Sequence, residues 1–136
     1  MLFRSIQEKD CGDFYSVGGR VFVDVEGERK ADKGAITYKK GGTKFTGTKD
    51  RIIRDVDHEK KVGEWNTIEI LIVGNTCVHV VNGKVNMILT NPRWRVDKKD
   101  TLLTKGKLQI QSEGAEVFYR NMAIKPLASI PPEYLK

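Results

Sequence analysis

Carboxylates gather around a glycine near the start of the chain. Glu8, Asp10 and Asp13 lie close together, and Gly12 separates the two aspartates. Paired carboxylates can act as general acid and general base, or can hold a hard cation such as calcium. Asp10 and Asp13 can equally form an Asx-type turn in which they bind backbone amides. The spacing leaves both interpretations open.

A polar stripe follows near the end of the chain. Gln109, Gln111 and Glu113 alternate with aliphatic or small residues, and successive side chains of a strand point to opposite faces of its sheet. We expect Gly106–Leu127 to form two closing strands with these three side chains on one face. Such a face either hydrogen-bonds a polyhydroxylated ligand or is simply solvated.

Three further residues have side chains suited to sugar chemistry. His79 lies on an otherwise apolar strand, where it can serve as a general base or as a buried structural residue. Arg120 can bind a carboxylate or steady a sugar, or it can pair with Glu116 or Glu113. Trp65 offers a stacking platform or an aromatic for the core or a sheet edge.

The composition limits the classes of protein. A chain of 136 residues with a net charge of +6 is long enough for one domain. Its basic residues alternate with acidic ones, so we expect no nucleic-acid site. No apolar run is long enough to span a membrane, and no secretion signal opens the chain. Cys11 and Cys77 are too few for a disulfide scaffold or a zinc site, and Cys77 is expected to be a small buried apolar residue.

The elements that must position these residues are short strands. Asn82-Gly83 between two apolar runs predicts a tight hairpin, because both central residues of a type I′ turn need a positive φ. Turn residues and short alternating runs indicate an all-β sandwich or jelly roll. Glu26–Lys49 is expected to form loops or weak edge strands, and Asn91–Lys105 a long connection. The other expected strands are Arg20–Val25, Ala35–Tyr38, Arg51–Val56, Trp65–Val73, Thr76–Val81 and Lys84–Leu89.

Four motifs, in order, resemble those of the 3-keto-disaccharide hydrolase domain family, which has a concanavalin A-like jelly-roll fold. The likeness covers the chain from Ile6 to about Leu127. The motifs are QEKDCGDFY at 7–15, GEWNTIEI at 63–70, HVVNGKVN at 79–86 and GKLQIQSEGAEVFYRN at 106–121.

The resemblance implies an enzyme that cleaves 3-keto-glycosides or related glycosides, with a carbohydrate as its partner and a periplasmic or extracellular location. A non-catalytic carbohydrate-binding sandwich is the alternative, as is an inactive fragment. No cofactor is certain, and calcium is a candidate. Neither the sugar nor the oligomeric state follows from the sequence. The catalytic candidates are Glu8, His79 and Glu113, and the substrate-binding candidates are Asp10, Asp13, Gln109, Gln111, Arg120 and Trp65.

The start of the chain departs from the family pattern. Bacterial members of the family usually carry further strands and a signal before the segment that here begins at Gln7, so we expect a sandwich that is truncated at its N-terminus. Residues 2–5 are also what the DNA string CTC TTC CGA TCT encodes, which matches a common sequencing adapter. We therefore expect residues 1–5 to be a non-native lead, residues 6–127 to be the C-terminal part of the family's β-sandwich, and residues 128–136 to be a tail.

Overall fold

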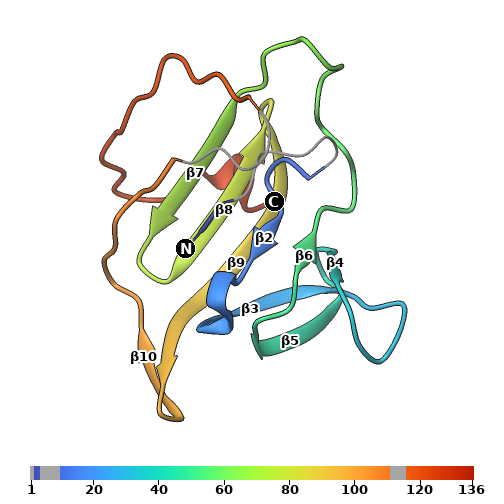
Figure 1. The fold of residues 1–136 in the computed structure, drawn as a ribbon, viewed down its shortest axis with the longest axis vertical. Coiled ribbons are helices and arrows are strands. Elements are labelled where there is room, and N and C mark those ends of the chain that lie inside the picture. The colour runs from blue at the N-terminus through green and yellow to red at the C-terminus, as the bar shows by residue number, and fades with distance from the viewer. Residues whose placement is uncertain (1, 4–9, 111–115) are drawn as a thin grey trace.

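The regular secondary structure of the described residues is almost entirely β-strand (Figure 1). The computed structural model describes residues 2–3, 10–110 and 116–136. These residues form ten strands and two short 3-10 helices, so the predicted all-β class is confirmed. The elements are β1 (Leu2–Phe3), β2 (Phe14–Tyr15), η1 (Val17–Gly19), β3 (Val21–Glu28), β4 (Ile36–Tyr38), β5 (Thr43–Thr48), β6 (Ile52–Ile53), β7 (Ile68–Val73), β8 (Thr76–Val81), β9 (Lys84–Val96), β10 (Lys99–Leu102) and η2 (Pro132–Tyr134).

All the described strands belong to one curled sheet. Their order is β1-β2-β6-β4-β3-β9-β8-β7, with β10 added to β9 and β5 added to β3. Among the described residues every pairing is antiparallel except that of β4 with β6. The first half of β3 pairs with β9 and its second half with β4, so β3 joins the two parts of the sheet (Figure 1).

Two apolar clusters hold the sheet together. The larger one is buried between the two parts of the curled sheet, and the smaller one lies on the other side of β7 and β8. Cys77 is 1% exposed, as predicted, and burial raises the pKa of its thiol to about 12. The larger cluster contains Phe14, Val21, Val23, Val25, Ile36, Tyr38, Ile52, Cys77, Met87 and Leu89.

The central hairpins follow the sequence signals. Asn82 and Gly83 join β8 to β9 with φ of 51° and 76°, which confirms the predicted type I′ geometry. Gly74, with φ of 58°, begins the turn between β7 and β8. Turn residues that accept a positive φ therefore fix the register of the three strands.

The expected long connection at Asn91–Lys105 is wrong. β9 continues through Pro92 to Val96, and a hairpin at Asp97 and Lys98 leads directly into β10. Both turn residues have positive φ, 49° and 64°. Pro92 has no N–H to donate, but its carbonyl accepts a 2.8 Å hydrogen bond from the Leu103 amide, so the proline does not interrupt the strand.

The two expected closing strands at Gly106–Leu127 are also wrong for the described residues. Residues 103–110 and 116–127 contain no strand, and Leu108 and Ile110 are 72% and 51% exposed. Alternation produces a strand only where a neighbour supplies the ladder hydrogen bonds, and no described strand pairs with these residues. Residues 103–110 instead run as an extended segment alongside the sheet, and residues 116–127 form a loop outside it (Figure 1).

The end of the chain packs back onto the sheet. Ile130 is 8% exposed and forms the smaller cluster with Leu71, Val78 and Val80. Lys40 Nζ donates a hydrogen bond to the Leu135 carbonyl, which ties the last residues to the β4–β5 turn. Residues 130–135 thus cover the face of β7 and β8 that points away from the larger cluster.

Candidate functional site

Two buried side chains hold the turn that carries Asp10 and Asp13. The register of β8 and β9 shifts between His79 and Val80, and Asn86 is the extra residue of the resulting bulge. Asn86 Nδ2 donates to the Cys11 carbonyl at 2.9 Å, and His79 Nδ1 lies 2.8 Å from the Gly12 carbonyl. Gly12 has a φ of 84°, and a Cβ there would lie 2.5 Å from Asn86 Nδ2. Position 12 of the turn therefore requires glycine, and the contacts with Asn86 and His79 fix where the turn lies.

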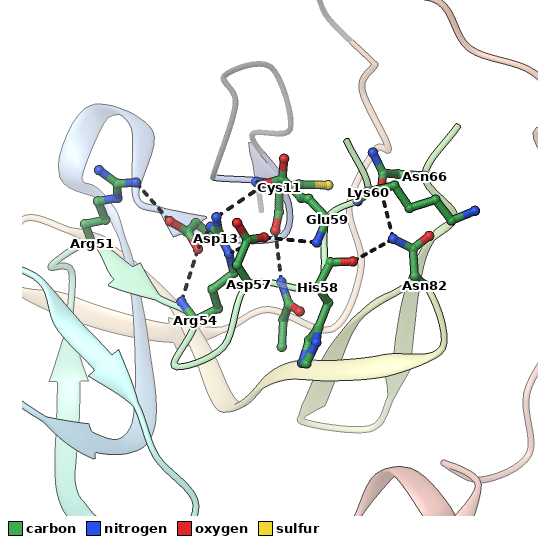
Figure 2. A network of polar contacts seen from close by, with 11 residues as sticks. Cys11, Asp13, Arg51, Arg54, Asp57, His58, Glu59, Lys60, Asn66 and Asn82 are labelled. Atoms are coloured by element: carbon green, nitrogen blue, oxygen red, sulfur yellow. Dashed lines mark hydrogen bonds and ion pairs between the residues drawn. The ribbon is translucent and has the colours of Figure 1, made fainter. Parts of the chain in front are cut away.

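Asp13 is enclosed by two arginines. Its carboxylate is 1% exposed and accepts hydrogen bonds from Arg51 Nη2 at 2.9 Å, Arg54 Nη1 at 3.1 Å and the Arg54 amide at 3.1 Å (Figure 2). The charge of this buried carboxylate is thus compensated by guanidinium groups. Asp13 consequently acts here as a structural anchor that a dissolved substrate does not reach.

Arg54 extends this network into the following loop. It is 7% exposed and also pairs with Asp57 at 3.5 Å and Glu59 at 3.4 Å. Glu59 in turn accepts a 2.7 Å hydrogen bond from the Cys11 amide (Figure 2). One arginine thereby ties the turn at residues 10–13 to the loop at residues 54–59.

His79 is fully buried beneath the same turn. A carbonyl can only accept, so Nδ1 carries the proton of the neutral ring and donates it to the Gly12 oxygen. Burial lowers the pKa of His79 to about 4, although the hydrogen bond to Gly12 opposes this shift. The imidazole is therefore neutral at neutral pH, and in this arrangement it is closed off from solvent.

A second polar network fixes the loop that carries Trp65. Asn82 Nδ2 donates to the His58 carbonyl at 2.7 Å and to Asn66 Oδ1 at 2.8 Å (Figure 2). Asn82 Oδ1 accepts from the Thr67 amide at 2.9 Å. The hairpin turn between β8 and β9 thus anchors residues 58–67 and, with them, the position of Trp65.

Trp65 and Arg120 meet at the surface. The Arg120 guanidinium lies 3.9 Å from the centroid of the indole, within the range of a cation–π contact. Trp65 is 43% exposed and Arg120 is exposed as well. Both residues were substrate-binding candidates, and the structure brings them together although they are far apart in the sequence.

Of the other candidates, those that the structure describes do not join this pair. Asp10 is 5% exposed, and Gln109 is exposed in the extended segment. Glu8, Gln111 and Glu113 lie outside the described residues. Within residues 10–110 and 116–136, no group of three or more His, Cys, Asp or Glu is placed to hold a metal ion. The described part of the chain also contains no helix that is long and apolar enough to cross a membrane.

Sequence reasoning missed Arg54, Glu59, Asn82 and Asn86. Arg54 falls in the expected strand Arg51–Val56, and nothing local shows that it is the partner of Asp13. Asn82 was used only as a turn residue, whereas its side chain also anchors the Trp65 loop. A signal was present only for Asn86, a polar residue between apolar residues of a buried strand.

The comparisons with known proteins identify the family. The chain matches the 3-keto-alpha-glucoside-1,2-lyase-like domain over residues 4–125. Searches of curated proteins and of solved structures returned no match. Together with the curled all-β sheet, the match confirms the predicted jelly-roll class. The chain therefore belongs to the 3-keto-alpha-glucoside-1,2-lyase-like domain family.

Proposed function

We propose that this domain binds 3-keto-α-glucosides and cleaves their C1–O bond by elimination, with Trp65 and Arg120 as substrate-binding residues. The observation that carries the proposal is the exposed Trp65–Arg120 contact in a chain of this family. The ketone at C3 acidifies the proton at C2. A base removes that proton, the C1–C2 double bond forms, and the C1–O bond breaks as the leaving oxygen takes up a proton.

The two side chains offer complementary chemistry to such a substrate. The flat indole of Trp65 packs against the C–H face of a sugar ring. Arg120 presents several N–H donors and a permanent positive charge, which stabilise the enolate that develops on the C3 oxygen. The network around Asn82 limits the motion of the Trp65 loop, so the platform is formed before substrate arrives.

We propose Glu113 as the general base. It belongs to the same segment as Arg120, and a carboxylate is a suitable proton acceptor. The described alternatives fit less well, since Asp10 and Asp13 are buried and His79 is fully enclosed. Glu8 is the remaining candidate for the acid that protonates the leaving oxygen.

Replacing Arg120 tests the role of its charge. We expect Arg120→Met to lower kcat/KM for 4-nitrophenyl 3-keto-α-D-glucopyranoside about tenfold, because a half-solvated charged hydrogen bond contributes about 1.4 kcal/mol. Arg120→Lys keeps the charge but loses the planar donor pair. Its kcat/KM should therefore lie between those of the wild-type protein and Arg120→Met. Release of 4-nitrophenol gives the rates.

A matched variant separates this effect from the loss of a positive charge in general. Lys125→Met removes an exposed cation from the same segment and should keep the wild-type rate. Equal rates for Arg120→Met and Lys125→Met would contradict the assigned role of Arg120.

A carbohydrate-binding domain without catalysis is the second candidate. One observation favours it: in the described part of the chain, the ionisable candidates Asp10, Asp13 and His79 are buried rather than facing an open site. Such a domain would bind the 3-keto-glucoside and its unoxidised parent and would release no 4-nitrophenol from either.

A further inference from the structure

A second exposed aromatic surface lies on the hairpin of β9 and β10. In the register of this hairpin Trp94 faces Thr101 and Val96 faces Lys99, so these four side chains share one face. They surround an open depression of about 330 Å³. Its lining residues are Trp94, Val96, Asp97, Lys99 and Thr101.

The apolar part of this face is left open to solvent. Trp94 is 37% exposed and Val96 is 48% exposed. The Arg20 guanidinium lies 6.0 Å from the Trp94 centroid, at the outer limit of a cation–π contact, so it leaves much of the ring uncovered. Trp94 is paired on both sides, with Val21 and Thr101, yet more than a third of it stays exposed beside the exposed Val96. An exposed apolar patch that is rimmed by polar residues is typical of an interaction site.

The opposite face of the hairpin makes the surface rigid. Arg95 donates to both carboxylate oxygens of Asp100, at 2.5 Å and 2.8 Å, and its guanidinium lies 3.9 Å from the centroid of Phe22. The Arg95 amide also bonds the Arg20 carbonyl at 2.9 Å, which ties the hairpin to the residue preceding β3. The Trp94 face is therefore held in place before any ligand binds.

We propose that this hairpin face is a second carbohydrate-binding surface, which takes one or two neutral pyranose rings. A pyranose has an apolar C–H face and a rim of hydroxyl groups. The indole of Trp94 and the side chain of Val96 can pack against the apolar face. Thr101, Asp97 and Lys99 can form hydrogen bonds with the hydroxyl groups. Asp97 and Lys99 in the lining carry opposite charges, and Arg20 beside Trp94 adds one positive charge, so the net charge of this face is small, as suits a neutral ligand. A volume of about 330 Å³ is at the small end of ligand sites, as one or two rings require.

This surface is separate from the proposed reaction site and does not depend on it. Trp65 precedes β7, whereas the β9–β10 hairpin projects from the other end of the sheet (Figure 1). A sugar chain held at the hairpin would raise the local concentration of the domain on a polymeric or oligomeric carbohydrate. The hairpin would thus contribute to targeting rather than to bond cleavage.

The chain offers a direct test, because it contains only two tryptophans. Trp65→Phe leaves Trp94 as the sole indole, and Trp94→Phe leaves Trp65. We expect maltose, cellobiose or trehalose to change the emission of the Trp65→Phe protein in a saturable way, with half-saturation at roughly 1–10 mM. Glycerol at equal concentration controls for bulk solvent effects.

A pair of threonine variants completes the experiment. In the Trp65→Phe background, Thr101→Val should weaken binding about threefold to tenfold, since one hydrogen bond to a hydroxyl is lost. Thr43→Val replaces an exposed threonine of strand β5 and should leave sugar binding unchanged. The proposal is overturned if none of the three sugars gives a saturable response, or if both threonine variants bind as well as their parent. A response that is confined to Trp94→Phe would overturn it while leaving the Trp65 site intact.

Discussion

We expect Asp13→Ala to lower the free energy of unfolding by about 3 kcal/mol. Asp13 is buried and joins Arg51, Arg54 and the Arg54 amide in one network. Its removal leaves the Arg54 amide and Nη1 without their acceptor in a buried site. The loss stays at the lower end of the 3–5 kcal/mol typical of broken buried pairs, because Arg54 keeps Asp57 and Glu59. Urea denaturation gives the value.

An exposed ion pair provides the matched control. Glu28 accepts a hydrogen bond from Lys39 Nζ at 2.7 Å, with side chains that are 60% and 52% exposed. Removing it by Glu28→Ala should cost less than about 1 kcal/mol, since surface pairs are screened by solvent. If Asp13→Ala costs no more than Glu28→Ala, the network around Arg54 does not anchor the turn as described.

The second large effect is a loss of stability in mild acid. Burial lowers the pKa of His79 to about 4 in the folded protein, against about 6.5 in the unfolded chain. Between these values the unfolded chain binds a proton that the folded protein does not bind, so stability falls as the pH falls. From pH 7 to pH 5 we expect His79 to contribute a decrease of about 2 kcal/mol, and no change above pH 7.

His79→Asn isolates this contribution. The asparagine amide can still donate to the Gly12 carbonyl but does not titrate. The variant should therefore be less stable than wild type at pH 7, owing to lost packing, and should lose less stability than wild type between pH 7 and pH 5. Parallel slopes for the two proteins in this interval would show that His79 is not the titrating group.

The sequence predicted the central part of the fold because its signals are local. The positive φ at Asn82-Gly83 and the alternation in β3 depend on neighbours in the chain, and they appear as expected. The Asp97-Lys98 hairpin was missed, because neither residue is a strong turn signal and Pro92 suggested an interruption. The stretch at Gly106–Leu127 has the alternation of a strand but pairs with no described strand, and a sequence pattern does not reveal whether a partner edge is available.

In the candidate site, too, the sequence predicted the local chemistry but not the long-range contacts. Side-chain chemistry singled out Trp65 and Arg120, and only the fold could show that they meet. The sequence left His79 open as either a base or a structural residue, and the structure shows that its side chain is fully buried. Arg54 acts through contacts with a residue far away in the chain, so no local spacing reveals it. Asn86 stands out as a polar residue in a buried strand, but its partner Cys11 lies 75 residues away, so the contact itself does not follow from the sequence.

The most direct test of the proposed function compares two substrates that differ only at C3. The wild-type protein is incubated with 4-nitrophenyl 3-keto-α-D-glucopyranoside and, separately, with 4-nitrophenyl α-D-glucopyranoside. Elimination requires the acidic C2 proton that only the ketone provides, so we predict 4-nitrophenol release from the 3-keto substrate and none above background from its parent. Equal release from both substrates, or release from neither, would contradict the proposal.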